Sequence, residues 1–214
     1  MYKYFTLAVI ATVASCMPHD FKKAEVQGDN PMPVVPANFE ATSYAYIFSN
    51  GRLAPANEWS TKRYSSDLNK IYEVEGIVND EGDEVTTSAE STDVSAKTSV
   101  EYTQGKACTT NTNVQADNVS TQIATFFSQF SFAGLQYAPW ELTRVKYYRL
   151  DGNGVQYYYK QSNLALRFFV EIISDTQSRV HDFSGGLIEK SFTDADFVLS
   201  ECQAKVAQPT EFLQ

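Results

Sequence analysis

Hydrophobic and polar residues alternate along most of the chain after residue 38, and this period of two predicts β-strands with one buried face. The clearest run is 164–174, where Leu164, Leu166, Phe168, Val170 and Ile172 occupy every second position. Shorter runs of the same kind predict further strands. These span residues 39–48, 59–66, 69–78, 94–102, 142–150, 155–160 and 178–183.

Turn residues separate the predicted strands. Asn50-Gly51 ends the first strand, and residues 79–82 carry a second turn signal. Asp151-Gly-Asn-Gly154 is the strongest hairpin signal and joins 142–150 to 155–160. Residues 85–93 are rich in Ser and Thr and fit either a strand with polar faces or a loop. The chain is therefore expected to form a mostly antiparallel β domain.

One segment has a helical period instead. Ile123, Phe126, Phe127 and Phe130 are spaced i, i+3, i+4 and i+7 within residues 121–130, which places them on one face of a helix. Asn118 or Ser120 can cap its start, and a glycan on the former would leave this role to the latter. A helix of about three turns is marginal alone in water. Its phenylalanines are therefore expected to pack against the sheet.

Residues 1–16 have the layout of a secretory signal peptide. Lys3 is the only charge ahead of an apolar run at 5–14. The small residues Ala14 and Ser15 stand at its end, as at a cleavage site. This run is shorter than the roughly 20 residues of a membrane-spanning helix, and no later segment is long and apolar enough to span a membrane. A buried N-terminal element is the alternative. We expect a protein that is secreted or held in the lumen of the secretory pathway.

The end of this segment, residues 13–16, also resembles a bacterial lipobox, in which Cys16 would be lipidated; otherwise Cys16 is removed with the signal. Residues 17–37 contain Pro31, Pro33 and Pro36 and predict an extended leader. A single domain is then expected over residues 38–204, followed by a polar tail at 205–214.

The chain is acidic, with 26 Asp and Glu residues against 17 Lys and Arg and a formal charge of −9. Such a surface repels phosphate backbones and anionic lipid, so nucleic acid is excluded as an expected partner. In an oxidising compartment, Cys108 and Cys202 are expected to form a disulfide, although two free buried thiols are the alternative. Asn118-Val119-Ser120 is an N-glycosylation sequon.

Residues for catalysis or metal binding are scarce. His19 and His181 are the two histidines, and the first lies in the leader, so a two-histidine metal site is excluded. His181 with Asp182 or Asp175 could form part of a triad, but the chain has no G-x-S-x-G elbow. The acidic residues at 80–84 lack the spacing of a calcium loop. We expect no enzyme activity, no cofactor and no metal, although paired catalytic carboxylates stay open.

The C-terminal segment 194–202, in which acidic residues lead to Phe197, a short apolar stretch and Cys202, resembles the closing motif of ependymin-related proteins. Phe39-Glu-Ala, Cys108 ahead of the helical segment and the strand pair around 151–154 fit the same family. The chain has fewer cysteines than that family and carries an extra acidic, Ser/Thr-rich stretch at 79–99.

Ependymin-related proteins in turn resemble lipoprotein carriers of the LolA type. The resemblance implies a mainly β (α+β) fold, with a strongly curved antiparallel sheet, an open half-barrel, and one or two short helices covering its concave face. It also implies that an apolar cavity binds a lipid or another hydrophobic small molecule.

Thirteen Tyr and fourteen Phe residues would fill a core or line such a cavity. We expect a secreted binding protein for a hydrophobic small molecule or lipid; an extracellular structural or adhesive module with a filled core is the alternative, and a hydrolase using His181 ranks third. The expected ligand-binding residues are Ile123, Phe126, Phe127, Phe130, Trp140 and Phe168.

Overall fold

The computed structural model of the chain describes residues 35–137, 144–149, 155–160, 166–174 and 176–203, and every structural statement below concerns these residues. Strands dominate, and the longest helix has 10 residues. The elements are β1 (Asn38–Ser49), β2 (Arg52–Ser65), β3 (Lys70–Val78), β4 (Glu84–Asp93), β5 (Thr98–Thr103), β6 (Thr109–Thr112), α1 (Val119–Ser128), β7 (Ser131–Tyr137), β8 (Arg144–Arg149), β9 (Val155–Lys160), β10 (Leu166–Ser174), β11 (Gln177–Asp182), β12 (Ile188–Glu189), a 3₁₀ turn η1 (Asp194–Phe197) and α2 (Ser200–Gln203).

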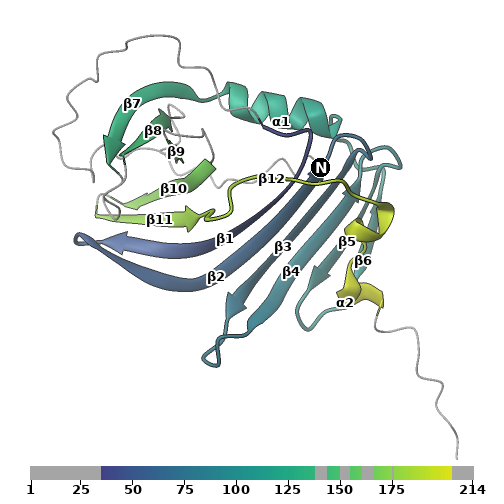
Figure 1. Ribbon diagram of the computed structural model, residues 1–214. Helices are drawn as coiled ribbons and strands as arrows, with labels where there is room; N and C mark the ends of the chain where they lie inside the picture. Colours follow the sequence, from purple (N-terminus) through teal and green to yellow (C-terminus); the bar gives the residue numbers. More distant parts are fainter. Residues whose placement is uncertain (1–34, 138–143, 150–154, 161–165, 175, 204–214) are drawn as a thin grey trace, which may run out of the picture.

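The strands form one 12-stranded sheet in the order β6-β5-β4-β3-β2-β1-β11-β10-β9-β8-β7, with β12 paired to β1 (Figure 1). The neighbouring strands pair antiparallel throughout. The predicted mainly β, antiparallel fold with few helices is confirmed. The prediction of strong curvature is not supported, because the sheet is neither closed nor strongly curled.

Most predicted strands are found, with shifted ends. The Ser/Thr-rich stretch at 85–93 forms β4, which pairs with β3 and β5 along its length. The predicted strand 94–102 begins later, at β5, because residues 94–97 form a turn. Lys97 there has a φ of 56° and Asp93 Oδ1 accepts a hydrogen bond from the Ala96 backbone. Three short or irregular strands were not predicted from the sequence: β6, β7 and β12.

The sheet has two faces, which we name by what packs on them. Phe39 and Tyr64 are paired across β1 and β2 and their rings stack at 5.2 Å between centroids. Both contact a cluster that includes Val119 and Ile123 of α1, so their side of the sheet is the helix face. Paired residues share a face and successive residues alternate. The side chain of Trp59 therefore lies on the opposite side, which we call the C-terminal face.

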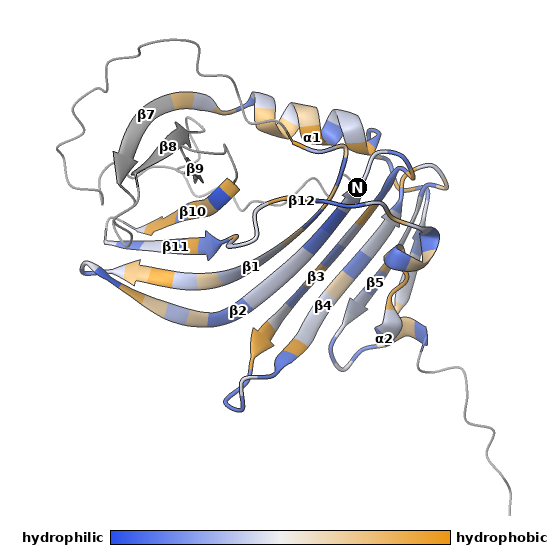
Figure 2. Cartoon of the chain, viewed as in Figure 1, coloured by the Kyte–Doolittle hydropathy of each residue, from blue (hydrophilic) through white to orange (hydrophobic). Residues whose placement is uncertain are grey.

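The C-terminal segment, residues 192–202, covers the C-terminal face over β2–β5. Phe197 and Leu199 pack against Trp59, Tyr72, Val74 and Ala89, and all six are buried. Figure 2 shows the alternation of hydrophobic and hydrophilic residues along these strands. Removing such side chains from water is the main source of stability here.

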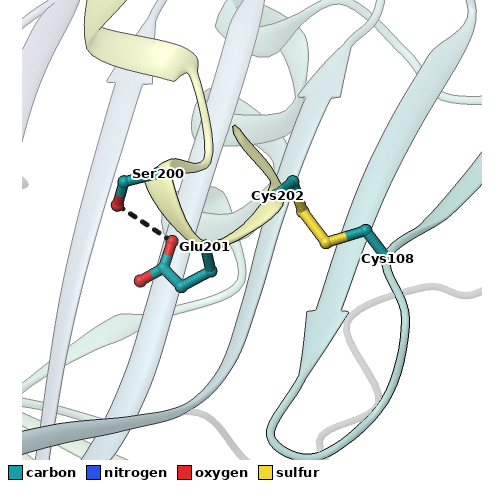
Figure 3. The surroundings of a disulfide bond; sticks show 4 residues. All are labelled: Cys108, Ser200, Glu201 and Cys202. Atoms are coloured by element: carbon teal, nitrogen blue, oxygen red, sulfur yellow. Dashed lines mark hydrogen bonds between the residues drawn. A yellow bond between two sulfur atoms is a disulfide. The ribbon is translucent and has the colours of Figure 1, made fainter. Parts of the chain in front are cut away.

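A disulfide between Cys108 and Cys202 ends this segment and confirms the predicted pairing (Figure 3). Their Cα atoms lie 5.8 Å apart, across a sequence separation of 94 residues. The bond links the chain just before β6 to α2. It therefore holds the C-terminal segment against the sheet at the point where the described chain ends.

Charged groups hold the same segment at its other end. The Arg63 guanidinium donates to Glu40 Oε2 at 2.6 Å and to the backbone carbonyl of Asp196 at 2.8 Å. Lys190 Nζ lies 3.3 Å from the same Glu40 carboxylate, and Lys70 Nζ lies 2.7 Å from Asp194 Oδ1. The residues between β12 and α2 are thus fixed by ion pairs as well as by buried rings.

The alternation of apolar residues in β10 is interrupted. The register of β10 against β9 shifts between Leu166 and Phe168, which marks a bulge. Leu166 consequently packs in a cluster with Phe130, which follows α1. Phe168 packs with Val170 and Val180 in a separate cluster. The prediction that one apolar face runs unbroken from 164 to 172 is therefore wrong over the described part.

Candidate functional site on the helix face

Helix α1 crosses several strands of the sheet on the helix face. Its first residue, Val119, is fully buried in the cluster of Phe39, Ala41, Tyr64 and Val94. The helix therefore begins over β1–β4.

Its second half lies over β10. There Phe126, together with Phe130 just after the helix, belongs to one cluster with Leu166 and Phe169. The Oδ1 atom of Asn118 accepts a hydrogen bond from the Thr121 backbone at 2.8 Å and caps the start of the helix. Asn118, and not Ser120, therefore caps the helix.

Three of the expected ligand-binding residues, Ile123, Phe126 and Phe127, lie on this helix, and the fourth, Phe130, follows two residues after its end because the helix spans Val119–Ser128 rather than 121–130. Ile123 packs with the first cluster, whereas Phe126 and Phe130 pack with the second. The ring of Phe126 meets Phe127 and Phe130 edge to face, at 5.3 and 5.6 Å between centroids. Phe130 is buried, and the other three are partly buried. Phe126 of the helix and Phe130 just after it thus bring two contacting rings against Leu166 and Phe169 of the sheet.

The other two expected residues do not join this surface. Phe168 is only 1% exposed and packs against Val170 and Val180. Its neighbour Phe169 belongs to the α1 cluster, and successive strand residues alternate between faces. Phe168 therefore lies on the side of the sheet away from α1. Trp140 lies outside the described residues.

A group of charged residues lies beside the aromatic cluster on the same face and was not anticipated from the sequence. On β10 and β11, Phe169 is paired with His181 and Glu171 with Arg179. The rings of Phe169 and His181 are 5.4 Å apart between centroids. On the next strand, β1, Ala45 is paired with His181. Because paired residues share a face, this group continues the surface that α1 covers.

Each cation of the group faces a carboxylate. Arg179 Nη2 lies 3.5 Å from Glu58 Oε1, and Lys62 Nζ lies 3.4 Å from Glu73 Oε1. The Tyr64 hydroxyl also donates to Glu73 Oε1, at 2.5 Å. The charged side chains of both pairs are partly exposed, so the pairs are screened by solvent and each contributes little to stability.

The pair of His181 and Glu171 is closer to the core. His181 Nε2 lies 3.5 Å from Glu171 Oε2. The imidazole lowers the pKa of the Glu171 carboxyl below its ordinary value despite the opposing effect of burial, and Arg179 and Lys62 lower it further. His181 Nε2 and the Glu171 carboxylate lie close together, but the contact does not have the geometry of a hydrogen bond.

Two buried nitrogen atoms of this group lack a hydrogen-bond partner among the described residues: Arg179 Nε and His181 Nε2. They project from positions two apart on β11, and such positions share one face at about 7 Å spacing. Buried polar atoms are usually paired. The aromatic cluster therefore forms an apolar surface, and the two nitrogen atoms beside it are polar groups that a ligand could still hydrogen-bond. We call residues Phe126, Phe130, Phe169, Glu171, Arg179 and His181 the helix-face site.

The sequence did contain a signal for this group. In the predicted hairpin of 164–174 and 178–183, the polar residues Glu171, Arg179 and His181 stand at positions that alternate with the apolar ones. Such positions normally face solvent. Only the placement of α1 over this side shows that it is partly covered.

The structure does not bring together His181 and Asp182, one of the two pairs that the sequence left open for a triad. Asp182 is adjacent to His181 on β11 and pairs with the Arg167 guanidinium. It is paired across the sheet with Phe168, so its side chain lies on the opposite face from His181. Asp175 lies outside the described residues. Among described residues, His, Cys, Asp and Glu side chains form no group of three suited to a metal ion.

Comparison with protein-family models and with curated proteins gives no match for this chain. Within the described residues, no helix combines the length and apolar character needed to cross a membrane. The disulfide is compatible with an oxidising, extracellular or luminal compartment.

Proposed function

We propose that this protein is a secreted binding protein for a hydrophobic small molecule or lipid, which it holds at the helix-face site. The observation that carries the proposal is the continuity of the aromatic cluster under α1 with the unpaired buried nitrogens of Arg179 and His181. An apolar surface with a few placed polar groups is typical of small-molecule sites.

The energetics of such binding are favourable. Each methylene of an acyl chain removed from water would contribute about 0.8 kcal/mol. Phe126 and Phe169 are partly buried rather than enclosed, so their rings offer apolar area that a ligand can still cover. The resemblance to ependymin-related and LolA-type proteins supports the same class of ligand.

The test is to purify the chain without detergent and to search for co-purifying lipid by mass spectrometry. A fluorescent fatty-acid probe then measures binding by the purified protein. Phe126→Ala is expected to weaken probe binding, whereas Phe192→Ala removes an equal ring from the C-terminal face and is expected to leave it unchanged. Neither co-purifying lipid nor a change in probe fluorescence would reject the proposal.

A specific observation favours one alternative. The rings of Phe126, Phe127 and Phe130 contact one another edge to face, and the last is buried. These contacts suit a filled core, as expected of an extracellular structural or adhesive module. This alternative predicts that Phe126→Ala lowers the free energy of unfolding, while the protein binds no apolar probe at any concentration below aggregation.

A further inference from the structure

We propose that the helix-face site takes a neutral amphiphile, such as an acyl ester, and that Arg179 donates a hydrogen bond to the ester carbonyl. This inference rests on the proposed function, and it names the chemistry of the ligand's polar end. The juxtaposition that carries it is an unpaired, buried guanidinium nitrogen next to carboxylates that already neutralise the local cations.

The Nε atom of Arg179 requires a hydrogen-bond acceptor. Arg179 uses Nη2 to face Glu58, and its buried Nε has no partner among the described residues. A guanidinium N–H can only donate, so an oxygen or another acceptor must come from outside these residues. Water satisfies such groups where they are exposed, whereas a buried group that lacks a partner destabilises the protein.

The charged residues around Arg179 favour an uncharged acceptor. Arg179 faces Glu58, Lys62 faces Glu73, and His181 faces Glu171. An added carboxylate or phosphate would therefore meet three carboxylates and no uncompensated cation. A carbonyl oxygen accepts the Nε hydrogen bond without introducing a charge, so the local balance favours an uncharged ligand.

The pairing of β10 with β11 sets the direction in which the apolar chain of the ligand can lie. Phe169 is paired with His181, and Glu171 with Arg179, so Arg179 is two positions farther along the hairpin from the α1 cluster. A ligand whose carbonyl reaches Arg179 can lay its chain over His181 and Phe169 towards the rings of Phe126 and Phe130. Ile47 of β1 is also paired with Arg179 and adds apolar surface beside it.

The experiment compares three competitors of equal chain length against a fluorescent apolar probe at neutral pH: dodecane, methyl dodecanoate and dodecanoic acid. We expect the ester to displace the probe about tenfold better than dodecane, since a hydrogen bond from a charged donor is worth roughly this factor or more. The acid is expected to compete less well than the ester.

The variants isolate the contribution of Arg179. Arg179→Met combined with Glu58→Gln removes the guanidinium without leaving its carboxylate unpaired, and we expect it to abolish the preference for the ester over dodecane. Arg52→Met, at the exposed start of β2, is the matched control and should keep that preference. Circular dichroism and thermal unfolding confirm that each variant is folded.

The outcomes separate the two proposals. Equal displacement by all three competitors, unaltered in the double variant, would reject the role of Arg179 while leaving an apolar binding protein. Preferential binding of the acid, enhanced by Glu58→Gln alone, would reject the neutral ligand in favour of an anionic one. If the protein does not bind the probe, the proposed function itself is rejected.

Discussion

Gly76 on β3 lies directly opposite Trp59 on β2, and the indole occupies the space where a Cβ atom at Gly76 would stand. Such a Cβ would lie 2.6 Å from Trp59 Nε1 and 2.3 Å from the backbone carbonyl oxygen of Val85. The register of β3 against β4 also shifts between Glu75 and Gly76. The glycine therefore allows the buried indole and a neighbouring strand to approach closely.

Gly76→Ala is expected to destabilise the protein by about 1–3 kcal/mol, because the indole and the backbone of β4 must shift to admit the methyl group. Equilibrium unfolding in urea measures the change. Gly185→Ala is the control, since its Cβ would meet only the flexible end of Ile188 at 3.4 Å. Equal effects of the two substitutions would contradict this account of the Trp59 packing.

Loss of the disulfide is expected to lower the free energy of unfolding by about 4 kcal/mol in the chain-entropy description, because Cys108 and Cys202 close a long loop. The double variant Cys108→Ser/Cys202→Ser tests this by thermal unfolding. Reductant should lower the melting temperature of the parent protein but leave that of the double variant unchanged. A parent protein insensitive to full reduction would contradict the prediction.

Stability should fall in acid partly through Glu40. Burial alone would raise the pKa of this carboxyl, but Arg63 and Lys190 outweigh it, so the pKa lies below its ordinary value of 4.5. A carboxyl with a lowered pKa in the folded state stabilises the protein above the unfolded-state pKa. This contribution is lost as the pH falls from about 4.5 through the folded-state value.

The substitution Glu40→Gln tests this assignment. The variant should be less stable than the parent at neutral pH, and the difference should shrink as the pH drops below 4.5. Urea unfolding at several pH values measures both curves. Parallel curves across this range would show that Glu40 does not titrate with unfolding. Glu81→Gln, in the exposed β3–β4 turn, is the control and should leave the pH dependence of the parent unchanged.

The sequence predicted the elements whose pattern is local. The runs at 39–48 and 69–78 became β1 and β3 because alternation and the turn at Asn50-Gly51 act within a few residues. The bulge that separates Leu166 from Phe168 could not be predicted, because β10 and β9 determine it together. Strand β7 was missed because its placement depends on pairing with β8 rather than on its own pattern.

For the candidate site, too, the sequence predicted only the residues whose pattern is local. The apolar face of α1 followed from the spacing of Ile123, Phe126 and Phe127, although Phe130, expected on the same face, follows the end of the helix. Its neighbours did not, because the register of β11 against β1 and β10 sets which strand residues lie beneath a helix. Glu171 and Arg179 therefore became candidates only once the register was known, whereas the sequence had offered His181 as a catalytic residue and not as part of a binding site.

The cap of α1 and the glycosylation sequon share Asn118, and the structure shows that the two roles are compatible. The cap uses Oδ1, whereas an N-linked glycan is attached through the side-chain nitrogen, so a glycan need not transfer the cap to Ser120. The side chain is exposed. If the protein is made in a eukaryotic secretory pathway, we therefore expect a glycan at Asn118 together with an intact helix.

Two substitutions separate these roles. Asn118→Asp keeps a capping oxygen but destroys the sequon, and it should remove the glycan with little loss of stability; Asn118→Ala should remove the glycan and also cost about 1 kcal/mol. Mass spectrometry after treatment with a peptide-N-glycosidase measures occupancy, because the enzyme converts a glycosylated Asn118 to Asp, and thermal unfolding of protein produced without glycosylation measures the cap. Ser120→Ala should abolish the glycan without affecting the cap. If Ser120→Ala destabilised the helix as much as Asn118→Ala did, the assignment of the cap to Asn118 Oδ1 would be wrong.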